Sequence, residues 1–219
     1  MNKETEKLIR SLFFPACLVI ILWLIKLSEI VFGLNFTFLG IYPLNVGGLA
    51  GIIFAPLIHA NITHLAANTG PLFFLSTAIF YFYRKVAWKV VFLTWLFTGI
   101  WVWFGAREAY HIGASGLVYG YASFIFFSGI IRSSKELLAI SLIVVFLYGG
   151  LVWGIFPVRE TISWESHLLG GIAGLILSVY FKEYGPVRRK IENGEDEDDT
   201  EQISGEEKET ADNDNDKLH

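Results

Sequence analysis

Residues 167–181 read HLLGGIAGLILSVYF, an apolar run that opens with a histidine and carries glycines at positions 170, 171 and 174. His167, Gly170 and Gly174 are spaced by three and four residues, so in a helix they lie on one face. Small residues at this spacing allow the backbones of two membrane helices to approach closely. The run therefore predicts a transmembrane helix that packs along a glycine face against a neighbour.

The rest of the chain repeats this apolar character. Of 219 residues, 53% are hydrophobic and 16% aromatic, which exceeds the usual content of a soluble domain. Crossing about 30 Å of hydrocarbon takes roughly 20 residues. Five further segments approach that length, namely residues 12–32, 64–83, 86–104, 115–131 and 137–153. We expect an all-α polytopic membrane bundle of six transmembrane helices spanning residues 12–185.

Charged residues indicate how the spans are oriented, because cytoplasmic loops retain an excess of Lys and Arg. These residues fall at alternate ends of the spans: Lys3, Lys7, Arg10, Arg84, Lys85, Lys89, Arg132, Lys135, Lys182, Arg188, Arg189 and Lys190. The opposite ends carry Lys26, Arg107 and Arg159, with tryptophans that suit an interface, Trp101, Trp103, Trp153 and Trp164. Both termini are thus predicted to be cytoplasmic, with residues 1–11 preceding an uncleaved first span in the cell membrane.

The acidity of the chain belongs to its C-terminal end. The formal net charge is -4, yet the sequence contains no Asp before Asp196. Residues 186–219 combine dense charge with few apolar side chains, so they cannot bury enough surface to offset the entropy of ordering. We expect an acidic, disordered cytoplasmic tail without a chemical role.

Polar side chains gather near the starts of the second, fourth and sixth spans, which run parallel if both termini are inside. The second span carries His64 and Asn68, the fourth Ser115, and the sixth His167, with His59 and His111 just before the second and fourth. Polar groups inside a membrane are costly and tend to mark function. Three separate segments are thus predicted to bring polar groups to one depth.

Ser115 and His167 have the chemistry of a nucleophile and its base, because a Ser hydroxyl needs an adjacent base to attack a carbonyl. Gly116 and Gly120 supply the fourth span with a glycine face that matches Gly170 and Gly174. The membrane body has no Asp, and Glu165 lies two positions from His167 and so faces elsewhere on a helix.

We therefore expect a Ser-His dyad rather than a triad. Tyr119, one turn beyond Ser115, either stacks on the imidazole of His167 or simply packs. His64 and Asn68 are one turn apart on a common face and can both donate hydrogen bonds. They either stabilise an oxyanion or join helices through polar contacts.

Together these motifs resemble the rhomboid family of intramembrane serine proteases. The resemblance rests on His59, His64 and Asn68, on Gly113-x-Ser115-Gly116, and on His167, Gly170 and Gly174, in that order. It implies cleavage of transmembrane proteins near the outer membrane face, with Ser115 as nucleophile and His167 as general base and acid. Asn68, His64 and the Ser115 N–H would form the oxyanion hole. It implies no metal, no cofactor and no nucleic-acid partner; the partners are transmembrane substrates and the lipid bilayer.

One feature departs from the family pattern. Many rhomboids carry a Trp-Arg pair in the loop after the first span, whereas residues 40–47 read GIYPLNVG. The resemblance therefore assigns no loop anchor here.

Two alternatives remain at the level of the sequence. Four histidines, His59, His64, His111 and His167, are predicted at one membrane face and could ligate a metal or haem. The same fold could also bind transmembrane clients without cutting them.

Overall fold

The computed structural model describes residues 2–147, 156 and 163–186, and within them every regular element is a helix. The longer helices are α1 (Lys3–Phe32), α3 (Ile62–Phe82), α4 (Ala87–Gly105), α5 (Ser115–Arg132), α6 (Lys135–Leu147) and α8 (Trp164–Tyr180). By length and apolar composition, α1, α3 and α4 are able to cross a membrane. An all-helical architecture with several apolar helices agrees with the sequence-based expectation.

The helix boundaries differ from the predicted spans mainly at the N-terminus. The α1 helix begins at Lys3 because the Asn2 side chain accepts the Glu4 N–H at 3.2 Å, while Glu4 and Glu6 favour the positive end of the helix dipole. Residues 148–153 of the predicted fifth span, residues 187–219 of the expected tail, and Arg159 lie outside the described residues.

Residues 33–61 connect α1 to α3 through short helical turns: η1 (Thr37–Leu39), η2 (Val46–Gly48), α2 (Gly51–Phe54) and η3 (Ala55–Leu57). Indole N–H groups of α4 hold this connection: Trp103 donates to the Asn45 carbonyl and Trp95 to the Ile52 carbonyl, each at 3.0 Å. Apolar side chains such as Val46, 80% exposed, remain uncovered along it. Exposed apolar side chains of this kind are typical of a surface that contacts a membrane or a partner protein.

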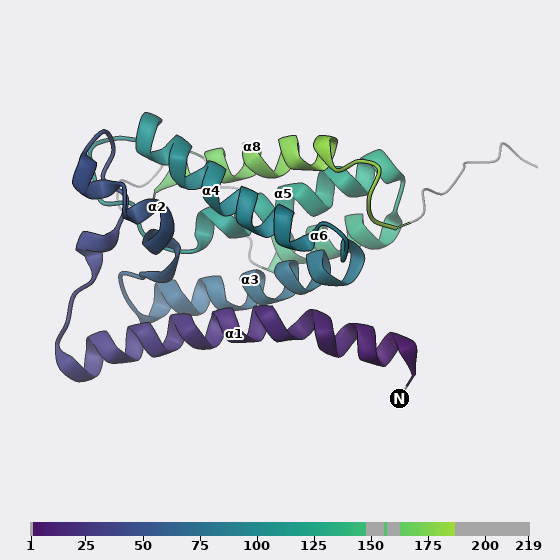
Figure 1. Ribbon diagram of the computed structural model, residues 1–219, viewed down its shortest axis with the longest axis horizontal. Helices are drawn as coiled ribbons and strands as arrows, with labels where there is room; N and C mark the ends of the chain where they lie inside the picture. Colours follow the sequence, from purple (N-terminus) through teal and green to yellow (C-terminus); the bar gives the residue numbers. More distant parts are fainter. Residues whose placement is uncertain (1, 148–155, 157–162, 187–219) are drawn as a thin grey trace, which may run out of the picture. The chain divides into compact units, whose positions relative to one another are not determined.

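The contact between α5 and α8, which lie side by side in Figure 1, depends on glycine. A Cβ atom at Gly170 would overlap the carbonyl oxygen of Gly116, and one at Gly174 would overlap that of Gly120. The two backbones therefore touch along the glycine faces that the sequence predicted. In addition, the Ser123 hydroxyl on α5 donates to the Gly171 carbonyl on α8 at 2.7 Å.

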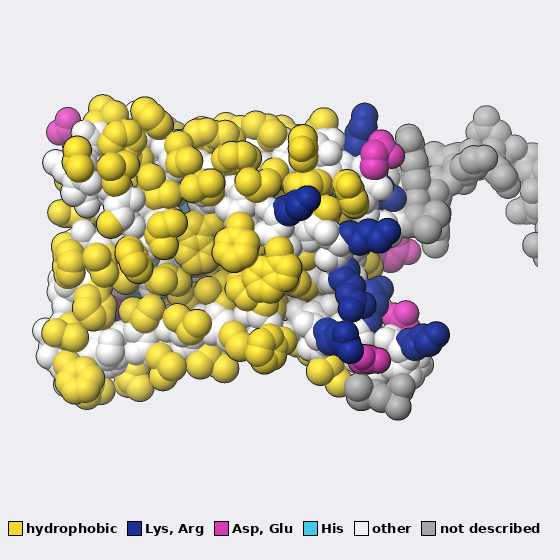
Figure 2. Space-filling model, viewed as in Figure 1, with side chains coloured by type: hydrophobic (Ala, Val, Ile, Leu, Met, Phe, Trp, Pro, Cys, Tyr) yellow, Lys and Arg dark blue, Asp and Glu magenta, His cyan; other side chains and the backbone are white. Residues whose placement is uncertain are grey.

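Charge is distributed unevenly over the surface. In the face shown in Figure 2, Lys and Arg side chains gather toward the end of the molecule where α1 begins and α8 ends, and hydrophobic side chains cover most of the rest. This pattern matches the charge asymmetry on which the predicted orientation depends.

The glycine contact leads to a stability prediction. Gly174→Ala should lower the free energy of unfolding by more than about 2 kcal/mol, because the new methyl group meets backbone that cannot rotate away. Gly171→Ala is the matched control: a Cβ there has nothing within 4 Å, and the substitution should be neutral or stabilising by up to about 1 kcal/mol. Denaturant unfolding in detergent micelles measures both, and equal stability of the two variants would contradict the proposed contact.

Candidate active site

Ser115 is the first residue of α5, and the turn before it depends on Gly113. Gly113 has φ 108°, a left-handed conformation that side chains disfavour, and its N–H donates to the Ala55 carbonyl at 2.9 Å. The turn places Ser115 where its own backbone N–H cannot be satisfied within the helix. The hydroxyl and a free N–H are thus presented at the same point.

His167 lies in the first turn of α8, directly opposite. Its Nε2 atom is 2.7 Å from the Ser115 Oγ atom, and the imidazole is buried. This hydrogen bond crosses between helices that touch through Gly116 and Gly170, so the glycine contact sets its length. A distance of 2.7 Å lies within the range for proton transfer from a hydroxyl to a base.

Tyr119 covers the imidazole from the α5 side. Its ring lies parallel to that of His167, with an interplanar angle of 9° and centroids 4.2 Å apart. Because Tyr119 is one turn beyond Ser115 on the same helix, a single helix presents both the hydroxyl and the ring that stacks on its partner. The stacking fixes the plane of the imidazole.

His64 and Asn68 approach from α3. A Cβ atom at Gly113 would lie 2.7 Å from the His64 Cε1 atom, so the His64 ring rests against the turn that precedes Ser115. The Asn68 Nδ2 atom donates to the His64 carbonyl at 3.0 Å, and Asn68 is buried. Two features therefore require glycine at position 113: its left-handed backbone conformation, and the His64 imidazole, which leaves no room for a side chain.

Ser115, His167, His64 and Asn68 line one cavity of about 620 Å³. Its lining includes Asn61, His64, Asn68, Arg107, Tyr110, His111, Ser115, Ser163 and His167. A cavity of this size is large enough for several residues of an extended peptide. The structure thus brings the expected polar groups of α3, α5 and α8 around one accessible space.

The structure adds contacts of His111, Ser163 and Ser166 that the sequence did not predict. His111 contacts the Ser163 hydroxyl through Nδ1 at 2.5 Å and the Arg107 carbonyl through Nε2 at 3.0 Å. Ser163 in turn contacts Ser166, next to His167, at 2.6 Å. The network joins the loop before α5 to the start of α8. In the sequence, His111 stood out only as a polar residue before the fourth span and a candidate metal ligand, and the two serines gave no signal, because their spacing follows no helical pattern.

Glu165 forms an ion pair with Arg107 and not with the His167 imidazole. Its carboxylate is buried and lies 3.6 Å from the Arg107 guanidinium. Glu165 therefore contributes charge to the loop before α5 and not to the orientation of His167.

Three of the four histidines of the metal alternative take separate hydrogen-bond partners, and the fourth, His64, packs edge-on against His59 with ring centroids 5.1 Å apart. His167 contacts Ser115, His111 contacts Ser163, and the Nε2 atom of His59 accepts the Ala114 N–H at 3.3 Å. Among the residues that the structure describes, no three His, Cys, Asp or Glu side chains are grouped to hold one metal ion.

Comparison with known proteins identifies the family. Residues 46–184 match the rhomboid domain. An uncharacterized protein of Mycobacterium tuberculosis (strain H37Rv) is 36% identical over 170 residues, which cover 72% of this chain and 70% of its own length. An uncharacterized protein of Mycobacterium leprae is 37% identical over 150 residues, covering 63% and 58% of the two chains. With its apolar helices and this match over most of its length, the chain is a membrane protein that belongs to the rhomboid family.

Proposed function

We propose that this protein is an intramembrane serine endopeptidase that cleaves transmembrane proteins near the outer face of the cell membrane. The observation that carries the proposal is the 2.7 Å contact between the Ser115 hydroxyl and the His167 imidazole beside a cavity of about 620 Å³. Membership of a family whose members are generally proteases supports it.

The proposed reaction begins when His167 takes the proton of Ser115 as the hydroxyl attacks a peptide carbonyl. The negative charge on the carbonyl oxygen is stabilised by the Ser115 N–H and by donors from Asn68 and His64. His167 then gives the proton to the leaving amine, which leaves an acyl group on Ser115. Water, activated by the same imidazole, hydrolyses this ester and restores the hydroxyl.

The bilayer explains why such an enzyme would select its substrates by helix stability. A transmembrane helix keeps its carbonyls in internal hydrogen bonds, because lipid offers no partner for them. A substrate must unwind locally before Ser115 can reach a carbonyl. Segments with small or helix-breaking residues near the site should therefore react fastest.

The proposal includes a topology of six spans with both termini in the cytoplasm, for which the positions of Lys and Arg are the support. In that arrangement the starts of α3, α5 and α8 face outward. Water then reaches Ser115 from the outer surface.

Substitution of either member of the dyad should stop cleavage. Ser115→Ala and His167→Ala should each abolish cleavage of a model transmembrane substrate in proteoliposomes, with retained melting temperatures. Ser28→Ala is the control, because that hydroxyl donates within its own helix to the Ile25 carbonyl at 2.7 Å, and it should cleave like the parent. Cleavage that persists in Ser115→Ala refutes the mechanism. If the parent protein binds such substrates without cutting them, the alternative of a rhomboid-like fold that only binds transmembrane clients is supported instead.

A further prediction concerns the oxyanion. Asn68→Ala should lower kcat by about 10²–10³ with little change in KM, because the donor acts mainly on the charge that develops during attack. Thr69→Ala, the adjacent residue, removes a hydroxyl that contacts Trp23 at 3.1 Å and should leave kcat within about threefold. Equal effects of the two substitutions on kcat would show that Asn68 is not part of the oxyanion hole.

A further inference from the structure

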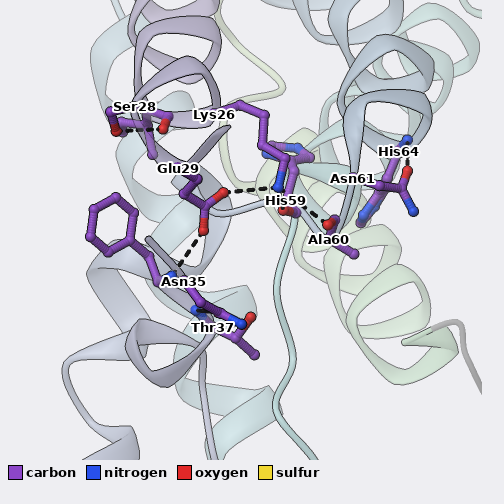
Figure 3. Close-up of polar contacts among 11 residues, drawn as sticks. Lys26, Ser28, Glu29, Asn35, Thr37, His59, Ala60, Asn61 and His64 are labelled. Carbon is purple, nitrogen blue, oxygen red and sulfur yellow. Dashed lines mark hydrogen bonds and ion pairs between the residues drawn. The ribbon is translucent and has the colours of Figure 1, made fainter. Parts of the chain in front are cut away.

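Lys26 and Glu29 form a buried ion pair near the end of α1. The Lys26 and Glu29 side chains point toward each other in Figure 3. The Lys26 Nζ atom lies 2.9 Å from Glu29 Oε2, and the side chains are 12% and 7% exposed. Removing two charges from water is expensive and is tolerated only where further hydrogen bonds satisfy both groups. The remaining partners of this pair therefore indicate what it holds in place.

Those partners are the two ends of the connection between α1 and α3. At its far end, Lys26 Nζ donates to the carbonyls of His59 at 2.9 Å and Ala60 at 3.2 Å. At its near end, Glu29 Oε1 accepts the Phe36 N–H at 2.8 Å. One ion pair thus fixes the beginning and the end of this connection to α1.

The segment that Lys26 holds reaches the candidate site in two directions. The buried His59 ring accepts the N–H of Ala114, the residue before Ser115, at 3.3 Å. Asn61 caps α3 by accepting the His64 N–H at 2.8 Å. Residues 59–61 therefore contact both the turn that carries Ser115 and the helix start that carries His64.

The electrostatics of His59 agree with its role as an acceptor. Burial lowers the pKa of His59 to about 3, with smaller contributions from His64 and the positive charge of Lys26. The imidazole is therefore neutral near pH 7, and a neutral ring keeps one nitrogen free to accept the Ala114 N–H.

We infer that Lys26 is a positioning residue, oriented by Glu29, that fixes residues 59–61 and through them the distance between the Ser115 turn and the oxyanion donors on α3. The inference rests on the proposed protease function. It goes further in assigning an anchor to a connection that lacks the Trp-Arg pair of many rhomboids.

The size of the expected effect follows from geometry. Misplacing a reacting group by about 1 Å can cost about 100-fold in rate. Lys26→Met keeps most of the length of the side chain but removes three hydrogen bonds and a charge. Residues 59–61 would then be free to shift while α5 and α8 remain packed through glycine.

The experiment compares Lys26→Met, Lys26→Arg and Glu29→Gln with the parent, and uses Lys89→Met, an exposed lysine of α4, as control. Each protein is measured for kcat and KM on a model transmembrane substrate. The rate constant and final extent of labelling by a fluorophosphonate, which phosphonylates a reactive serine with loss of fluoride, provide a second readout. Melting temperatures are recorded alongside.

For Lys26→Met we expect kcat and the labelling rate constant to fall at least tenfold, with KM within about twofold and labelling complete at long times. Lys26→Arg should recover part of the rate because it restores a cationic donor, and Lys89→Met should match the parent.

A parental rate constant in stable Lys26→Met overturns the inference. The inference is also overturned if Lys26→Met lowers only the final extent of labelling or only the melting temperature, because a purely structural residue would have that effect. If Lys26→Met does not fold, Glu29→Gln decides: a slower rate at full extent supports positioning, and a parental rate refutes it. A parent that neither cleaves nor labels refutes the proposed function itself, which separates the two failures.

Discussion

The close backbone contact between α5 and α8 is the constraint on which the candidate site depends. Gly116 and Gly120 meet Gly170 and Gly174 without intervening side chains, so the helices approach more closely than larger residues would permit. Ser115 and His167 stand at the starts of these two helices. Their hydrogen bond is therefore a consequence of how the helices pack.

A second set of contacts holds the irregular parts of the chain against this rigid pair. The indoles of α4 and the Lys26–Glu29 pair each link the connection before α3 to regular helix. An isolated backbone bridge between Ile41 and His111 links it to the loop before α5. Irregular backbone carries polar groups that lipid cannot satisfy, so it is tolerated where protein supplies the partners. The same contacts place α3 beside the Ser115 turn.

The sequence predicted those parts of the molecule whose residues recur at helical spacing. Helical spacing was enough to place His167 with Gly170 and Gly174, and to relate Ser115 to Tyr119. The α1 helix begins at Lys3, before the predicted span of residues 12–32, because its polar first turns are helical through capping and not through apolar character. The turns of residues 33–61 could not be foreseen, since they depend on partners distant in sequence. Lys26 gave only the signal of an isolated cation near the outer end of a span, and its partners at His59 and Ala60 lie outside any local pattern.

The proposed mechanism depends most on Ser115 being a nucleophile that His167 activates. Peptide mass spectrometry of the full-length protein, after reaction with a fluorophosphonate in detergent micelles, tests that claim at the level of the atom that reacts. The mechanism predicts one phosphonyl group per chain, attached to Ser115, and its absence from His167→Ala under the same conditions. An adduct on a different residue, or equal labelling of Ser115 without His167, would contradict it.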